Sequence, residues 1–319
     1  MTRFIRNFII SFAFVLPLMS CSMQVPPEHP VVYVSPVYAF MRDYPASKDA
    51  FAADSVEIAA FMRTVGAAFP DSAAIAAWAS SRAVEVFTPD VDSVFADSLM
   101  PARALGMVLD NASRSGLTLP VRRYATVVYG RPESILFVDS VMLIALNHYL
   151  GSDYPGYTGL PEYMRGFNKT PGALPYDIAE ALVATAYRFD GGSSPTMLSR
   201  MLYEGALAHA KLALVDNASA ARALGYSDEE FKWLADNETE LWRHIVGGKL
   251  LFDTSPATIS RFVLPAPRVN VGPLVAPGRA GRYIGYRIVQ EYLKDNKDAT
   301  IPYILTPGFY NTRIALDSY

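Results

Sequence analysis

The chain contains few of the residues and motifs on which common enzymes depend. It has one cysteine, Cys21, and four histidines in 319 residues. It has no G-x-S-x-G sequence and no P-loop, so no familiar nucleophile and no phosphate-binding loop stand out. Lysine and arginine number 28 against 31 aspartates and glutamates, without a run of basic residues. This charge pattern excludes an electrostatic surface for nucleic acid.

Long apolar runs are scarce as well. The run at residues 8–19 is interrupted by Pro17 and is shorter than the ~20 apolar residues that span a bilayer. Because Arg3 and Arg6 precede it, residues 1–20 are typical of a secretory signal peptide. We expect this segment to be removed from the mature protein.

The expected signal peptide ends in a sequence that suits lipid attachment. Leu-Met-Ser-Cys at 18–21 resembles the lipobox of bacterial lipoproteins, in which lipid is joined to the cysteine. A lipid on Cys21 would anchor the protein to a membrane without a spanning helix. An unmodified thiol or an ordinary signal peptide is the alternative. Ser22 follows, as in lipoproteins that are forwarded to the outer membrane, so we expect an outer membrane lipoprotein on the periplasmic face.

Hydrophobic residues make up 51% of the chain, enough for a large core. The prolines of residues 21–37 predict an extended tether, and residues 38–319 predict a single domain. Apolar residues at three- and four-residue steps predict helices at about 51–65, 75–86, 94–113, 176–188, 195–214, 231–246 and 284–292. Short runs at 123–129, 134–138 and 142–146 predict an antiparallel meander. The expected fold is α+β, mostly helical with a small antiparallel sheet.

The segment 148–165 is rich in glycine, proline and tyrosine and is too long for a plain connection. Loops that are held on a scaffold carry recognition more often than helices do. We therefore expect a binding loop here, with core packing as an equal alternative. Its candidate residues are His148, Tyr149, Asp153, Tyr154 and Tyr157.

The sequence RMLYEGALAHA at 200–210 has the outline of the metal-binding helix of zinc hydrolases. Such a helix needs H-E-x-x-H, two histidines one turn apart with a glutamate after the first. Glu204 occupies the glutamate position, but Tyr203 and Leu207 occupy the histidine positions. We expect a structural or solvated Glu204, which as a buried residue could pair with Arg200 one turn earlier, and a catalytic Glu204 is the alternative.

A zinc site would therefore need histidines from separate segments. His209 lies five residues after Glu204, on another face of the helix. Three ligands could come only from convergence of His148, His209 and His244, because His29 falls in the expected tether. We expect no cofactor, and zinc held by these three histidines is the alternative.

Three glycines, Gly278, Gly281 and Gly285, lie where the last helix is expected to begin. They predict close packing of that helix against a neighbour, in preference to phosphate binding. Arg279 and Arg282 lie between them and could hold an anion, although salt bridges to carboxylates are the commoner use of such residues.

Three separated motifs resemble one family. NHYLGSDYPGY at 147–157, NETELW at 237–242 and PGRAGRYIGYRIVQEYL at 277–293 have the order and spacing of the gliding-motility lipoproteins of the GldB type. That family is similar to zinc peptidases of the zincin fold, in which an intact H-E-x-x-H helix takes the place of RMLYEGALAHA.

The resemblance implies a degenerate zincin-like domain on a lipid-anchored protein. Its expected function is non-catalytic binding of envelope protein partners in the motility or secretion machinery. The first alternative is a hydrolase of envelope peptide or glycan, with or without zinc. The second is a scavenging lipoprotein, for which a deep apolar pocket would be the sign.

Overall fold

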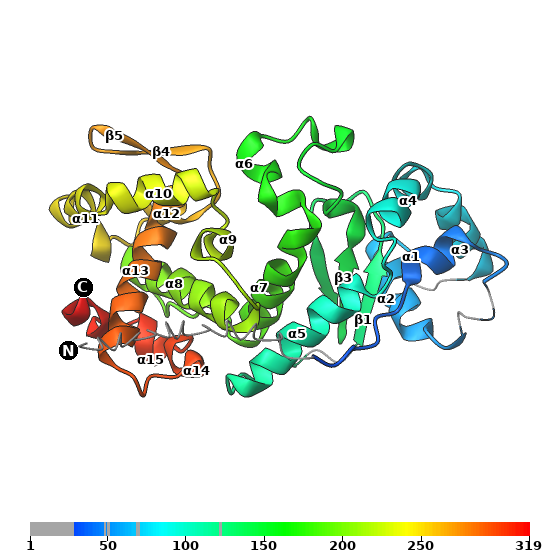
Figure 1. Cartoon of the computed structure of the whole chain (residues 1–319), viewed down its shortest axis with the longest axis horizontal. Helices are drawn as coiled ribbons and strands as arrows, with labels where there is room; N and C mark the ends of the chain where they lie inside the picture. Colours follow the sequence, from blue (N-terminus) through cyan, green and yellow to red (C-terminus); the bar gives the residue numbers. More distant parts are fainter. Residues whose placement is uncertain (1–28, 48, 50–51, 68–70, 121–122) are drawn as a thin grey trace, which may run out of the picture.

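Figure 1 shows a computed structural model of the chain, which describes residues 29–47, 49, 52–67, 71–120 and 123–319. The expected signal peptide, residues 1–20, and the expected lipidation site Cys21 lie outside these described residues. Within them helices predominate and two small sheets are present, so the fold class is α+β and mostly helical, as predicted. No helix in this part of the chain is long and apolar enough to cross a bilayer.

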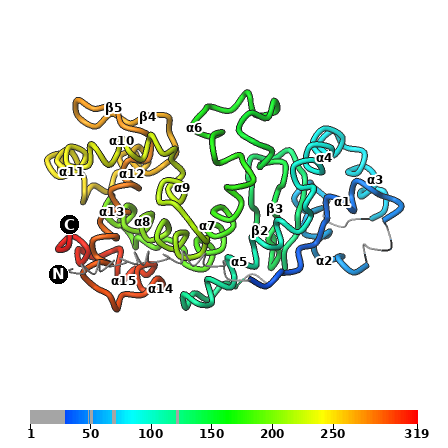
Figure 2. The backbone as a smooth tube through the Cα atoms, in the orientation of Figure 1, coloured from blue at the N-terminus to red at the C-terminus, as the bar shows by residue number. Residues whose placement is uncertain are grey.

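The helices and strands follow one another along the length of the molecule, from the N-terminal helices at one end to the C-terminal helices at the other (Figures 1 and 2). The α-helices are α1 (Val37–Arg42), α2 (Ser55–Thr64), α3 (Ser72–Ala79), α4 (Arg82–Val94), α5 (Met100–Arg114), α6 (Glu162–Arg165), α7 (Leu174–Ala186), α8 (Met197–Leu214), α9 (Ala220–Leu224), α10 (Asp228–Asp236), α11 (Glu238–Gly247), α12 (Pro256–Val263), α13 (Ala280–Asp295), α14 (Ile301–Ile304) and α15 (Pro307–Tyr310). The strands are β1 (Arg123–Val127), β2 (Ile135–Val138), β3 (Val141–Ala145), β4 (Arg268–Val271) and β5 (Leu274–Pro277). The first four helices and the sheet of β1 to β3 lie at one end, and α8 to α15 lie at the other.

Three strands form a mixed sheet in the order β1-β3-β2. β2 pairs with β3 in antiparallel fashion, as the expected meander requires, but β1 pairs with β3 in parallel, with Arg123 opposite Val141. The expectation of a wholly antiparallel sheet is therefore wrong for β1. All residues of β3 are buried whereas those of β2 are only half-buried, so β3 takes the centre and β2 the edge.

The sheet separates two cores. Ala125 and Leu143 point to one face, which α1 and α2 cover. Tyr124 and Met142 point to the other face and join the larger core, which α5, α7 and α8 share. The two sets alternate because successive strand residues point to opposite faces. Both faces are thus buried, and the sheet connects the helices of the two ends.

The helix α8 packs along α13 at the far end of the molecule (Figure 1). Gly285 admits the backbone of α8, since a β-carbon there would lie 1.9 Å from the carbonyl oxygen of Met201. Gly278 and Gly281 approach main-chain oxygens at 1.9 and 2.9 Å in the same way. The predicted close packing is confirmed for all three glycines.

The last part of the expected tether is packed on the domain. His29 bonds to Asp110 of α5 at 2.7 Å and to Asp216, between α8 and α9, at 2.9 Å. Ser35 forms a parallel bridge with Ala125 of β1 and so extends the sheet. The described fold therefore includes residues 29–37, because the histidine and the backbone of this segment find polar partners on the domain.

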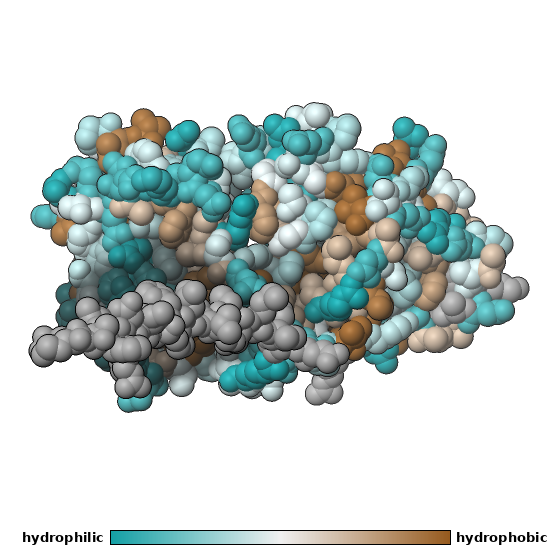
Figure 3. All heavy atoms as spheres, viewed as in Figure 1, coloured by the Kyte–Doolittle hydropathy of each residue, from teal (hydrophilic) through white to brown (hydrophobic). Residues whose placement is uncertain are grey.

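The hairpin of β4 and β5 has no counterpart among the expected strands. Its strands have only four residues each, and such short runs give little periodic signal. Val275 is 54% exposed, and the hairpin forms an apolar patch beside the hydrophilic surface of α10 in Figure 3. The other face of the hairpin covers the larger core, because Val269, Val271 and Ala276 are buried in it.

Candidate functional site

The helix α8 begins at a capping box and is buried along most of its length. The Thr196 hydroxyl accepts from the Ser199 amide, and the Ser199 hydroxyl accepts from the Thr196 amide. Tyr203 and Leu207 are buried, and the Tyr203 hydroxyl donates to the carbonyl of Tyr187 at 2.9 Å. The two positions at which an H-E-x-x-H helix carries histidines are therefore filled by packing residues.

Glu204 is held between two arginines. Its carboxylate lies 2.6 Å from Nη2 of Arg200 and 3.1 Å from Nε of Arg282, and only 3% of its side chain is exposed. The expected pair with Arg200 is confirmed, and Arg282 of α13 is an additional partner. The two ion pairs join α8 to α13, so the carboxylate serves the packing of these helices.

His148 is engaged by two polar groups beside the sheet. Its Nε2 lies 2.9 Å from the carbonyl oxygen of Arg131, and its Nδ1 lies 3.0 Å from Nζ of Lys169. Burial, together with the charge of Lys169, lowers the pKa of His148 to about 4. The ring is therefore neutral at pH 7, accepting from the lysine through Nδ1 and donating to the carbonyl through Nε2.

The other two candidate zinc ligands have separate surroundings. His209 stacks on Tyr286 with ring centroids 4.8 Å apart, its Nε2 lies 3.2 Å from the Tyr286 carbonyl oxygen, and burial lowers its pKa to about 4. His244 of α11 lies beside Phe262 and Gly272. Within residues 29–319, outside the gaps given above, no group of three or more His, Cys, Asp or Glu side chains is placed to hold a metal ion. The structure does not bring the three histidines together.

The first half of the expected binding loop packs into the domain. Tyr149 is buried and donates to Asp177 of α7 at 2.9 Å, while Tyr157 is buried and donates to the carbonyl of Asn147 at 2.6 Å. Tyr154 is half-buried and donates to Asp90, whereas Asp153 is exposed. The accessible part of the segment is its second half and the residues just after it.

A cleft lies beside that second half. Its outer pocket, of about 410 Å³, is lined by Tyr163 and Phe167 on one wall and by Arg222, Tyr226 and Arg268 on the other. Its inner pocket, of about 210 Å³, shares Phe167 and Arg222 with the outer one and ends against α7, α8 and α13. The lining residues come from α6 and α7 on one side and from α9 and β4 on the other, and Figures 1 and 2 show these elements.

The inner pocket gathers charged side chains from four helices, α7, α8, α9 and α13. Lys211 of α8 lies 2.6 Å from Oε2 of Glu180 on α7. The charge of Lys211, against the effect of burial, lowers the pKa of Glu180 to about 2. Asp177, one turn before Glu180, has its pKa raised to about 6 by burial and by the charge of Glu180. The two carboxyl groups thus lie in one pocket and have widely different pKa values.

Arg279 closes the inner pocket at the start of α13. Its backbone has a φ of 63°, and its Nη2 donates to the carbonyl of Gly225 at 2.6 Å. The side chain makes no ion pair within 4.0 Å with a carboxylate of the described residues, and its Nε has no hydrogen-bond partner there. Of the two arginines noted in the sequence, Arg282 forms the expected salt bridge and Arg279 does not.

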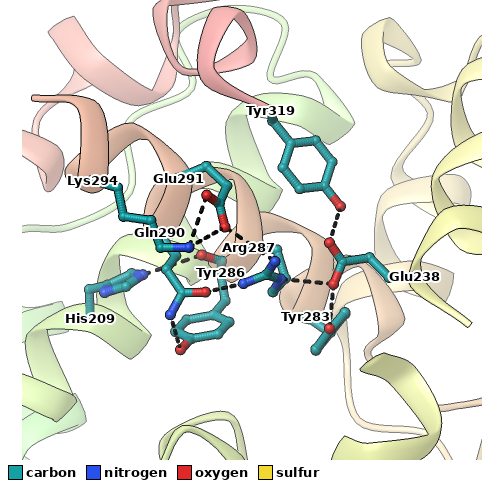
Figure 4. A network of polar contacts seen from close by, with 9 residues as sticks. All are labelled: His209, Glu238, Tyr283, Tyr286, Arg287, Gln290, Glu291, Lys294 and Tyr319. Atoms are coloured by element: carbon teal, nitrogen blue, oxygen red, sulfur yellow. Dashed lines mark hydrogen bonds and ion pairs between the residues drawn. The ribbon is translucent and has the colours of Figure 1, made fainter. Parts of the chain in front are cut away.

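A second polar cluster lies further along α13, and Figure 4 shows it. Glu238, at the start of α11, accepts from the hydroxyls of Tyr283 and Tyr319 at 2.6 and 2.9 Å and from Nε of Arg287 at 2.8 Å. Burial alone would raise the pKa of Glu238, but these bonds outweigh it and lower that pKa. The cluster joins the motifs at 237–242 and 277–293 to the last residue of the chain.

The family model described as gliding motility protein GldB matches residues 38–311. This range includes α8, both pockets of the cleft and Glu238, whereas Tyr319 lies beyond it. Among curated proteins and among solved structures, nothing matches the chain. Because the matched residues make up most of the sequence, the chain belongs to the GldB family of gliding motility proteins.

Proposed function

We propose that this GldB-family chain is a lipid-anchored envelope protein that binds a partner of the motility or secretion machinery and has no hydrolase activity. The environment of Glu204 is the observation that carries the proposal. Its carboxylate lies between Arg200 and Arg282 and is almost fully buried. A general base must reach a water molecule, and a carboxylate bound in this way is not free to do so.

The proposal treats the domain as a degenerate zincin. In that comparison α8 corresponds to the metal helix, with Tyr203 and Leu207 at the two histidine positions. Lys211 lies two turns after Glu204 on α8 and lines the inner pocket, so this helix still borders a cleft. A cleft that remains open beside packing residues suits binding without catalysis.

The proposed anchor places the domain close to a membrane. Lipid on Cys21, in the outer membrane and on the periplasmic face, is supported by the sequence at 18–22. His29, only eight residues further on, is already bound to the domain through Asp110 and Asp216. Eight residues extend at most about 28 Å, so the domain would lie within that distance of the lipid surface.

The anchor and the binding function are tested in cells of the native host. Labelled palmitate should be incorporated into the wild-type protein and not into the Cys21→Ser variant. Capture of the lipoprotein from detergent-solubilised membranes should yield a defined envelope protein. The purified lipoprotein should leave peptides and peptidoglycan intact with added zinc, and cleavage that is lost in Glu204→Gln would overturn the proposal.

One observation favours the alternative of a metal-independent hydrolase. Asp177 and Glu180 both line the inner pocket, and their pKa values of about 6 and about 2 are well separated. Such a pair can supply a general acid and a general base. This function predicts release of peptide or glycan fragments, with a rate that titrates near pH 6 and is abolished in Asp177→Asn. Absence of turnover by the wild-type protein would exclude it.

A further inference from the structure

The inner pocket has an unmatched positive charge. Its lining includes the cations Lys211, Arg222, Arg279 and Arg282 and the carboxylates Asp177 and Glu180. Glu204 lies directly behind Arg282 and pairs with it. The lining therefore holds four cations and two carboxylates, and Glu204 is shared between Arg282 and Arg200, so positive charge is in excess. An anion from outside would offset this excess.

Arg279 is the lining cation that has no carboxylate within 4.0 Å among the described residues; its guanidinium group lies 5.1 Å from the centroid of the Tyr226 ring. Its side chain is buried, with 9% of the residue exposed, and its Nε has no hydrogen-bond partner among the described residues. A buried donor without a partner destabilises the fold, and more so when the group is charged. Such a group is therefore expected where a ligand supplies the missing acceptor.

The surroundings of Arg279 keep space for its guanidinium group. Gly225 has a φ of 77°, and a β-carbon on it would lie 2.7 Å from Nη1 of Arg279. Any larger residue at 225 would push the guanidinium group out of its position. The helix α13, 16 residues long, begins at Ala280, so the positive end of its dipole adds to the charge at the pocket wall.

Arg222 is a second cation of the pocket without a close carboxylate partner in the described part of the chain. Its nearest carboxylate partner is Asp228 at 4.0 Å, and its guanidinium group lies over the ring of Phe167, 4.1 Å from the centroid. It lines both the inner and the outer pocket. A ligand that enters through the outer pocket would meet Arg222 first and Arg279 at the end.

We infer that the inner pocket binds the terminal carboxylate of a peptide whose preceding residues lie in the outer pocket. This inference rests on the proposed binding function and names the part of the partner that is recognised. The inner pocket, about 210 Å³, is smaller than sites for whole drug-sized ligands and fits a single group. Arginine recognises carboxylates through paired N–H donors, and the terminal carboxylate of a peptide presents the acceptors that match them.

The test compares two ligand pools on the purified full-length lipoprotein. A random tripeptide pool with free carboxyl ends should raise the melting temperature, because a ligand that binds only the folded state stabilises it. The same pool with amidated ends should bind at least about tenfold more weakly, the loss expected for a charge-assisted hydrogen bond. Equal stabilisation by both pools, or stabilisation by inorganic phosphate alone, would overturn the inference, as would no stabilisation at all.

Substitutions in the pocket test which residues bind the peptide carboxylate. Arg222→Gln, in a half-exposed side chain, should weaken binding of the free-acid pool about tenfold, whereas Arg82→Gln, with a side chain that is 80% exposed on α4, should not change it. Glu180→Gln removes a competing carboxylate and should strengthen binding. If Arg222→Gln binds the pool as the wild type does, this inference fails. If it fails while the same membrane partner is still captured, the proposed function is retained.

Discussion

Gly205 of α8 and Gly285 of α13 lie in direct backbone contact. A β-carbon on Gly205 would lie 2.4 Å from the carbonyl carbon of Gly285. The neighbouring atoms belong to the backbone, so they cannot move aside as a flexible side chain would. A histidine at position 205, one turn before His209, therefore does not fit, and the spacing of a zinc-binding pair cannot be restored through this position.

The first prediction concerns this contact. Gly285→Ala should lower the free energy of unfolding by roughly 1–3 kcal/mol, because the added methyl group overlaps the backbone of Met201. Urea unfolding followed by circular dichroism measures the change. Gly247→Ala is the matched control, since a β-carbon there meets nothing within 4 Å and alanine gains up to about 1 kcal/mol in a helix. An unchanged urea midpoint for Gly285→Ala would contradict the packing of α8 on α13.

The second prediction concerns Glu204. Glu204→Gln should destabilise the fold by on the order of 3 kcal/mol, because it removes the charge that compensates two arginines at a buried site. Glu85→Gln is the control, since Glu85 and its partner Arg82 have side chains that are 69% and 80% exposed, and such pairs contribute little. Unfolding in denaturant compares the two. Wild-type stability of Glu204→Gln together with lost cleavage of a peptide would assign Glu204 to catalysis instead.

Features that depend on neighbouring residues could be predicted from the sequence. The pair of Arg200 and Glu204 one helical turn apart is confirmed. Ser227 and Glu230, three residues apart in the sequence, form a capping box at the start of α10. The close approach at Gly285 is confirmed too. Several glycines near the start of a helix indicate positions at which no side chain fits. Each of these features is indicated by residues that are only a few positions apart in the sequence, so the sequence alone is enough to predict it.

Features that depend on distant segments could not be predicted. The parallel pairing of β1 with β3 follows from the path of the chain through β2, and hydrophobic patterns do not record that path. The cleft joins Phe167, Arg222 and Arg279 from three separate segments. Arg279 was recognisable as a candidate anion ligand, but only the fold shows that it lacks a carboxylate partner among the described residues.

The third prediction concerns the end of the chain. The ring of Tyr319 packs edge-on against Trp242, with centroids 5.0 Å apart, and its hydroxyl donates to Glu238. Tyr319→Phe keeps the ring and removes the bond, so the free energy of unfolding should fall by about 1 kcal/mol. Tyr163→Phe in the cleft is a control with an expected change within about 0.5 kcal/mol. Equal losses in both variants would show that the bond to Glu238 does not stabilise the fold.

His29 connects the segment 29–37 to the rest of the domain through charges. Burial disfavours the charged ring, but the hydrogen bonds and charges of Asp216 and Asp110 outweigh it and raise the pKa of His29 above its ordinary 6.5. Burial likewise disfavours the charged form of Asp216, and bonds from His29 and Asn111 outweigh it and lower the pKa of Asp216 below 3.8. Both groups are charged between these ordinary values.

The last prediction follows from these two shifts. Because the pKa of His29 is raised in the folded state, its charged ring stabilises the fold. This stabilisation is complete below pH 6.5 and is lost as the pH rises through the pKa of His29 in the folded protein. The lowered pKa of Asp216 stabilises the fold above pH 3.8 and is lost as the pH falls through its own folded-state value. The difference in urea midpoint between the wild type and His29→Gln should therefore be largest near pH 5 and smaller at pH 9. A difference that is constant from pH 5 to pH 9 would mean that packing of the ring, and not its charge, holds this segment on the domain.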